Sequence, residues 1–256
     1  MPHSPRRPAS TVSRSSRRRP FTALIVLLPL LALGWAVIVG VPGIPPGGTS
    51  VPGSGGSAAT ATGDAANLLA TLPVKGKAAK SGYDRTGEFG SAWRDVDGNG
   101  CDTRNDILAR DLTAIVTDES CRVQSGELVA PYTGESVSFE RGETSSMLVQ
   151  IDHLVALSNA WQTGAQQLDR DARIALANDP LNLLASDGAS NSQKGDGDAA
   201  TWLPAKKSFR CEYVARQISV KAAYGLWLAP AEHDAMARVL ASCPGQPAYA
   251  DAPGTE

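Results

Sequence analysis

The sequence predicts an α+β fold that is rich in helix, and three observations support this prediction. Residues 125–146 alternate polar and apolar side chains between glycine breakers, which is typical of short strands or a hairpin. Residues 147–157 form an apolar run that begins as a further strand. Residues 210–227 repeat apolar side chains at helical spacing, and a proline at the start of residues 230–243 indicates another helix.

The N-terminal part of the chain has the pattern of an export signal. Residues 1–20 hold six arginines and no acid, and residues 21–41 contain no charge over a length that can span a bilayer. This pattern predicts a cleaved signal peptide or an uncleaved membrane anchor, with the following domain outside the cell. Residues 42–66 are mostly Pro, Gly, Ser, Thr and Ala and predict a disordered linker.

One domain at residues 67–243 and a flexible tail at 244–256 are expected to follow. Six of the 24 basic residues and none of the 26 acidic residues precede residue 42, which leaves the remainder 18 against 26, a net charge of −8. An acidic domain binds polyanions poorly unless positive charge gathers locally. One such cluster exists, although ordinary surface charges would look the same: Lys194, Lys206, Lys207, Arg210, Arg216 and Lys221.

The four cysteines lie in the part of the chain that is expected to be exported, where disulfides are the default. The absence of a C-x-x-C pair argues against a structural zinc site. Three pairings are possible, and local closure favours Cys101 with Cys121 and Cys211 with Cys243.

The stretch from Asp95 to Asp106 imitates a calcium-binding loop, with Asp, Asp and Asn at alternate positions and an acid at position twelve. The imitation is incomplete, because position twelve is Asp and Asp102 occupies a place where such loops carry an apolar residue. The simpler interpretation is an Asp/Gly turn before a helix at 104–112, capped by Asp102 or Thr103. A calcium-stabilised extracellular binding module is the alternative.

Asp152 and His153 lie side by side inside the apolar run at 147–157. Burying an ionised carboxylate costs several kcal/mol unless a cation or hydrogen-bond donors compensate it, so Asp152 needs a partner. The candidate partners lie downstream, between residues 177 and 196. Because neighbouring residues on a strand face opposite ways, Asp152 and His153 can serve one site only if the strand ends or bends between them.

Helical patterns at 153–167 and 169–177 separate this strand from a second apolar run at 183–185. The second helix is expected to stop at Asn178-Asp-Pro180, because the residue before a proline avoids the helical region. Asn182 precedes the second run, and a turn at 186–188 then leads to Asn191 and Lys194.

The order of a strand with Asp-His, an excursion, an Asn-led strand, a turn and Asn-x-x-Lys resembles the HNH nuclease superfamily with its ββα-metal fold. The likeness is strongest to the C-terminal HNH domain of GmrSD-type restriction enzymes and of secreted actinobacterial proteins. Four segments carry it: Gln-Ile-Asp-His-Leu-Val-Ala-Leu, Ala-Asn-Asp-Pro-Leu-Asn-Leu, Asn-Ser-Gln-Lys-Gly-Asp and Ala-Ala-Thr-Trp-Leu-Pro. The resemblance covers about residues 68–243, with a core at 147–200, and differs from the literal letters because Asp152-His153 and Asn191 hold the outer positions.

The resemblance implies a metal-dependent endonuclease that hydrolyses phosphodiester bonds, with DNA favoured over RNA. His153 suits the general base, because an imidazole titrates near neutral pH. Asp152 and Asn191 offer oxygen ligands for a divalent cation, Mg²⁺ or else Mn²⁺. Asn182 matches the family residue that orients the base, and Lys194 is expected to contact the substrate phosphate.

Two other readings stay open at this point, the calcium-stabilised module and an HNH scaffold that has lost activity. The intact Asp152, His153, Asn182 and Asn191 argue against the second. The implied partners are a nucleic-acid substrate and, if residues 21–41 are uncleaved, the membrane. No protein partner can be inferred.

Overall fold

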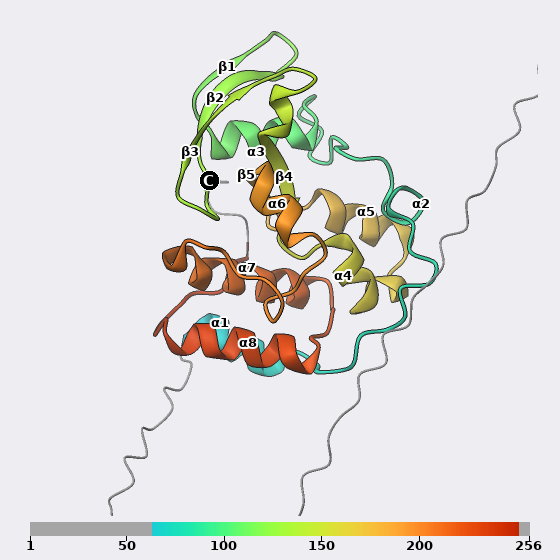
Figure 1. The fold of residues 1–256 in the computed structure, drawn as a ribbon. Coiled ribbons are helices and arrows are strands. Elements are labelled where there is room, and N and C mark those ends of the chain that lie inside the picture. The colour runs from blue at the N-terminus through green and yellow to red at the C-terminus, as the bar shows by residue number, and fades with distance from the viewer. Residues whose placement is uncertain (1–62, 251–256) are drawn as a thin grey trace, which may run out of the picture. The chain divides into compact units, whose positions relative to one another are not determined.

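The computed structural model describes residues 63–250 of the chain (Figure 1). The expected basic region, the signal or anchor segment at 21–41 and most of the linker lie outside these residues. None of the helices in residues 63–250 combines the length and the apolar character that a membrane span requires. Helix α1 (Asp64–Thr71) begins inside the range expected to be linker, because its Leu69 is buried in the core.

The centre of the fold is a ββα unit, as the resemblance implied. Strands β4 (Val149–His153) and β5 (Leu183–Asp187) pair antiparallel, and helix α6 (Gly188–Lys194) follows β5 directly. Both faces of β5 are buried, because Leu183 packs into one apolar cluster and Leu184 into another. This explains why the strand appears in the sequence as a continuous apolar run.

The excursion between the two strands is less regular than the sequence predicted. The continuous helix expected at 153–167 is wrong: helix α4 spans only Leu157–Gln162 and a 3₁₀ turn, η2, covers Ala165–Gln167. The amide of Val155 bonds to the side chain of Asn182, and Gly164 has a φ of 132°. Helix α5 (Arg170–Asn178) then matches the prediction and is capped by Asp169.

A three-stranded antiparallel sheet of order β1-β2-β3 lies beside this unit. Strand β3 (Ser136–Glu140) lies inside the expected strand region, and β2 (Val123–Val129) begins two residues before it. Strand β1 (Thr113–Thr117) was not predicted. A 3₁₀ turn, η1 (Ser145–Met147), leads on to β4. Helix α3 (Thr103–Asp111) packs against β2 and β5.

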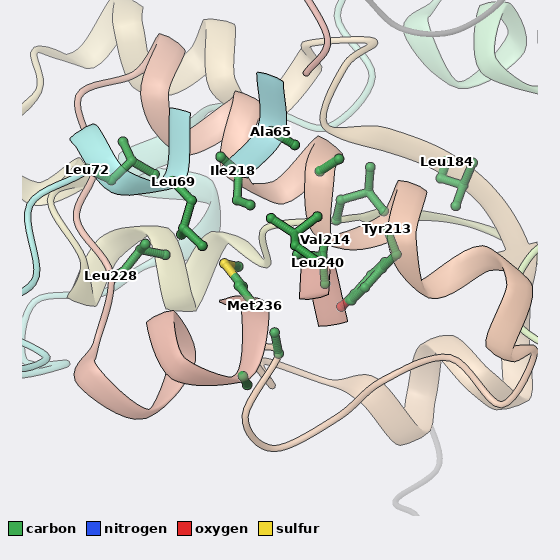
Figure 2. Close-up of a cluster of buried hydrophobic side chains, with 14 of the residues drawn as sticks. Ala65, Leu69, Leu72, Leu184, Tyr213, Val214, Ile218, Leu228, Met236 and Leu240 are labelled. Carbon is green, nitrogen blue, oxygen red and sulfur yellow. The ribbon is translucent and has the colours of Figure 1, made fainter. Parts of the chain in front are cut away.

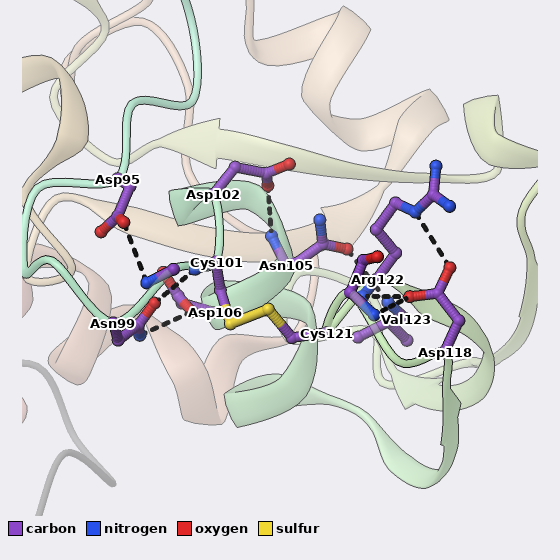
Figure 3. Close-up of a disulfide and its surroundings, with 12 residues drawn as sticks. Asp95, Asn99, Cys101, Asp102, Asn105, Asp106, Asp118, Cys121, Arg122 and Val123 are labelled. Carbon is purple, nitrogen blue, oxygen red and sulfur yellow. Dashed lines mark hydrogen bonds and ion pairs between the residues drawn. A yellow bond between two sulfur atoms is a disulfide. The ribbon is translucent and has the colours of Figure 1, made fainter.

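The disulfide between Cys101 and Cys121 joins the residue before the N-cap of α3 to the turn between β1 and β2 (Figure 3). Asp102 caps α3 by accepting a hydrogen bond from the amide of Asn105, as the sequence predicted. Asn105 in turn accepts from the amide of Val123, so the helix and the sheet are linked by both covalent and hydrogen bonds.

Helices α1, α7 (Arg210–Ala223) and α8 (Pro230–Ala241) pack together as a helical layer (Figure 2). A short 3₁₀ turn, η3 (Lys207–Phe209), precedes α7, which ends four residues earlier than expected, just before Gly225 at a φ of 60°. The second predicted disulfide, Cys211 to Cys243, is confirmed and ties the start of α7 to the end of α8. The apolar residues of the layer include Leu69, Leu72, Val214, Ile218, Leu228, Met236 and Leu240.

Residues 73–93, named the strap here, connect the helical layer to the α4–α5 side of the ββα unit (Figure 1). Backbone hydrogen bonds hold the strap along its course, from Lys75 to Leu228 and from Ala78 to Gln162. Its short helix α2 (Arg85–Phe89) packs against α5. The sequence of this segment gave no structural signal.

Candidate active site

An open cleft of about 310 Å³ lies at the end of β4. Residues of β4 and of the loop after it, residues of and just after α6, and the strap form its walls. Three of the sequence-predicted site residues line it together, whereas Asn182 and Lys194 do not. The cleft is lined by Lys80, Tyr83, Arg85, Ile151, Asp152, His153, Ala156, Leu157, Ser158, Asn191, Gly195 and Asp196.

Asp152 is buried and has the compensating partner that its burial requires. Its Oδ1 accepts a hydrogen bond from the ammonium of Lys194 at 3.0 Å, and its Oδ2 accepts one from the hydroxyl of Tyr132 at 2.5 Å. Burial raises the pKa of Asp152, and the positive charge of Lys194 opposes that shift. The lysine comes from the downstream stretch named by the sequence. Tyr132, in the loop between β2 and β3, was missed.

Lys194 therefore takes a different place from the expected one. Its side chain is fully buried, and its ammonium binds the Asp152 carboxylate and, at 2.8 Å, the carbonyl oxygen of His153. An ammonium held in this way is directed at the protein and not at a substrate phosphate. Lys194 is the last residue of α6, and these two bonds tie its ammonium to Asp152 and to the end of β4.

His153 is buried at the last position of β4. Its Nε2 lies 2.8 Å from the carbonyl oxygen of Ala177, which can only accept, so Nε2 carries the proton and Nδ1 has a free lone pair. Burial, and next the positive charge of Arg85, lowers the pKa of His153 to about 3. The ring is thus neutral around neutral pH, and it stacks against Trp93 with centroids 6.2 Å apart.

The expectation that the strand ends or bends between Asp152 and His153 is wrong, because both residues pair with β5 and β4 ends only at His153. Both residues nevertheless border the same cleft at the end of the strand. His153 also borders a smaller hollow of about 40 Å³ on the side of Trp93 and Asn178. The histidine is thus held between the strap, β4 and the end of α5.

Asn182 is completely buried and holds the chain around the histidine. Its Oδ1 accepts from the amide of Val155 at 2.8 Å, and its Nδ2 donates to the carbonyl of Leu176 at 3.3 Å. These bonds fix the loop just after His153 and the end of the helix that presents the Ala177 carbonyl. That Asn182 orients His153 stays a prediction.

Asn191 lies on the part of α6 that faces the cleft. Its Nδ2 donates to Oε1 of Gln150 at 2.8 Å, which fixes the amide so that its Oδ1 has no partner among residues 63–250. Each oxygen of Asp152 accepts one hydrogen bond and keeps a further lone pair. Carboxylate and amide oxygens are ligands that Mg²⁺ and Mn²⁺ prefer, so the two residues fit such an ion.

Two protein ligands would leave the rest of the coordination shell to water and phosphate oxygens, which is usual for Mg²⁺. The described part of the chain contains no group of three or more His, Cys, Asp or Glu side chains arranged to hold a metal, and metal binding by Asp152 and Asn191 stays a prediction. Asp196 also borders the cleft. Its Oδ2 accepts from Lys80 at 2.8 Å and from Ser158 at 3.1 Å.

The basic cluster expected after the site does not form a surface. Lys194, Arg216 and Lys221 are buried. Arg216 donates to the carbonyls of Leu181 and Leu183, and Lys221 pairs with a glutamate. Half of the cluster is thus part of the core: Lys194 ends α6, and Arg216 and Lys221 belong to a stretch of α7, residues 213–221, that is buried throughout.

The Asp95 to Asp106 stretch forms the expected turn before a capped helix (Figure 3). The two carboxylate oxygens of Asp95 accept from the amides of Gly98 and Gly100. The side-chain amide of Asn99 donates to Asp106 at 3.2 Å. The acidic side chains are thus bonded within their own turn, and calcium binding there stays a prediction.

The fold and the residues at its cleft define a nuclease-like domain of the HNH type. Residues 102–239 match the family model of GmrSD restriction endonucleases, C-terminal domain. An uncharacterized secreted protein of Arthroderma benhamiae is 36% identical over 181 residues, which cover 70% of this chain and 84% of that protein. No solved structure matches. The chain belongs to the GmrSD C-terminal domain family, and the resemblance is confirmed.

Proposed function

We propose that this protein is an exported, metal-dependent HNH endonuclease that hydrolyses phosphodiester bonds, with DNA favoured over RNA. The observation that carries the proposal is the placing of His153, Asp152 and Asn191 around one cleft. The histidine is neutral and its tautomer is fixed by the Ala177 carbonyl, which leaves Nδ1 free to accept a proton. A general base beside two oxygen ligands is what hydrolysis of a phosphodiester requires.

In this mechanism the scissile phosphate lies in the cleft and a water molecule lies between its phosphorus and His153. Nδ1 takes a proton as the water attacks, and the Ala177 carbonyl stabilises the imidazolium through Nε2. Asn182 keeps the imidazole of His153 and the carbonyl of Ala177 in a fixed relative position. A divalent cation bound by Asp152 and Asn191 would neutralise charge on the phosphate and on the leaving 3′ oxygen. The family resemblance implies a 5′-phosphate product.

The negative phosphate also improves the base. The low pKa of His153 comes from burial and from positive charge, and an anion bound in the cleft opposes both effects. Lys194 and Tyr132 hold the Asp152 carboxylate in one orientation and so keep its remaining lone pairs directed to the site.

Export is supported by the basic and apolar N-terminal pattern and by the secreted description of the fungal relative. Two disulfides in the domain agree with an oxidising compartment. Residues 21–41 would serve as a signal peptide or as an anchor that keeps the nuclease at the cell surface.

The test is nicking of supercoiled plasmid by the purified, oxidised protein with Mg²⁺, with Mn²⁺ or with EDTA. We expect metal-dependent nicking that is lost in His153→Ala, with circular dichroism unchanged. His233→Ala is the matched control, because His233 lies on α8 with its nearest partner Asp234 and is remote in sequence from the site. No nicking of DNA or RNA with any metal would favour an inactive HNH scaffold.

A further inference from the structure

We propose that Arg85 of the strap binds the substrate phosphate in the cleft, which makes it a substrate-contacting residue of a site that the matched family segment alone leaves incomplete. This inference rests on the proposed function, since it names a phosphodiester as the ligand. Arg85 precedes residues 102–239, the part of the chain that matches the family model. The expected phosphate contact, Lys194, is turned into the protein, so the role is open.

The position of Arg85 is the first argument. It is the first residue of α2 and is exposed. It borders the main cleft together with Asp152, His153 and Asn191, and it also borders the small cavity on the other side of the histidine. Arg85 and His153 thus share the lining of both hollows. A phosphate next to His153 therefore lies within reach of Arg85.

The guanidinium of Arg85 is also available to bind a phosphate. Among the residues that the structure describes, no carboxylate lies within ion-pair distance of Arg85, whereas the cleft's other exposed cation, Lys80, is bound by Asp196 at 2.8 Å. The acids beside Arg85 in the chain are engaged elsewhere: Asp84 caps α2, and Glu88 pairs with Arg173 at 2.8 Å. An arginine fork without a carboxylate suits a phosphate, which it can bind through two parallel hydrogen bonds.

The backbone around Arg85 is held in place by neighbouring side chains of the strap. Arg173 of α5 binds both the carboxylate and the backbone carbonyl of Glu88. Phe89 is buried against Trp161, with ring centroids 6.3 Å apart. The elements that position Arg85 thus use other side chains, so removal of its guanidinium should leave the fold intact.

The experiment compares Arg85→Gln with Arg94→Gln in the whole oxidised protein. Arg94 follows the strap directly, is exposed, and borders a different hollow with Asp95 and Asp171, so it is a control of equal charge. Binding of a fluorescein-labelled DNA duplex is measured by anisotropy in EDTA over a series of salt concentrations. Nicking is measured with metal present, and circular dichroism checks the fold of each variant.

We expect Arg85→Gln to weaken binding about tenfold and to reduce the slope of log K against log salt by about one, as for one lost phosphate contact. Nicking should fall about a hundredfold, because an arginine on the phosphate also stabilises charge in the transition state. Arg85→Lys should recover part of the binding, since it restores the charge but not the fork. Arg94→Gln should stay within twofold of the unmodified protein.

The outcomes separate this inference from the proposed function. If the unmodified protein nicks DNA and Arg85→Gln matches Arg94→Gln in binding and in nicking, the nuclease stands and the role of Arg85 is overturned. If no protein nicks but Arg85→Gln alone loses DNA affinity and salt slope, the nuclease proposal fails and Arg85 is still supported as a phosphate ligand.

Discussion

Among residues 63–250, two lysine–carboxylate pairs are buried, one in the helical layer and one beside the cleft. Lys221 of α7 binds Glu232 of α8 at 2.7 Å, and Lys194 of α6 binds Asp152 of β4 at 3.0 Å. The first pair is enclosed by protein: Lys221 also donates to the Trp227 carbonyl, and Glu232 accepts from an amide at the start of its helix. The second pair borders the cleft through Asp152.

The Lys221 pair therefore serves the fold, whereas we expect the Lys194 pair to serve the site as well. Burial lowers the pKa of Lys221, and the charge is maintained first by Glu232 beside it and then by the negative charge of Asp198. Nothing about the Lys221 pair faces a ligand, and its removal should affect stability alone. The Lys194 pair fixes a carboxylate at the cleft, and its removal should affect both stability and activity.

The largest effect is expected for Lys221→Met. Without the ammonium, Glu232 is left as a buried charge, and we expect a loss of about 3–5 kcal/mol in the free energy of unfolding. Urea denaturation of the oxidised protein measures it, and the nicking rate per folded molecule should not change. The double variant Lys221→Met/Glu232→Leu should regain most of the loss, because apolar side chains can replace a buried pair. A single variant that loses under 1 kcal/mol would contradict this account.

A smaller stability effect, coupled to a loss of function, is expected for Lys194→Met. Asp152 keeps the hydroxyl of Tyr132 and borders the open cleft, so we expect about 2 kcal/mol of destabilisation. The metal concentration for half-maximal nicking should rise, because the freed carboxylate loses its fixed orientation. Lys207→Met, on an exposed lysine of the same sequence cluster, should change neither quantity. Equal nicking curves for the Lys194 variant and the unmodified protein would separate Lys194 from the site.

The contrast between these lysines also shows which features of the fold and the site the sequence can predict. The ββα order, the helix caps and the disulfide pairing follow from local patterns, and so does the need of Asp152 for a partner. Whether a lysine points inwards depends on which face of its helix packs, and composition does not encode this. Lys194 was therefore assigned to the substrate although it is bonded to Asp152.

The residues at the site that the sequence does not predict come from distant segments of the chain. Tyr132 and Arg85 reach the site through tertiary packing, and neither lies in a periodic or spaced pattern. The overlong helix at 153–167 has the same cause, because Asn182, 27 residues after Val155, takes the bonds that a helix would use. The sequence predicts Asp152, His153 and Asn191, which line one cleft, but does not predict the strap opposite them.

The smallest effect is expected for a third pair, which is half-exposed and joins the strap to the turn after α6. Lys77 binds Asp198 at 2.7 Å, and Asp198 also accepts from the amide of Ala200 and from the hydroxyl of Thr201. Burial raises the pKa of Asp198, but the bonds and charge of Lys77 outweigh it and hold the pKa below its usual value. Solvent screening at Lys77 limits the contribution to about 1 kcal/mol.

The sign of the pH dependence follows from that lowered pKa. The folded protein holds the proton of Asp198 less tightly than the unfolded chain, so the stabilisation is complete above the unfolded pKa of about 4. It is lost as the pH falls through the lower pKa of the folded state. Asp198→Asn should therefore be less stable by about 1 kcal/mol at pH 7 and equal to the unmodified protein near pH 2, in urea denaturation at each pH. A difference that stays constant over this range would show that the carboxylate contributes through shape and not through its charge.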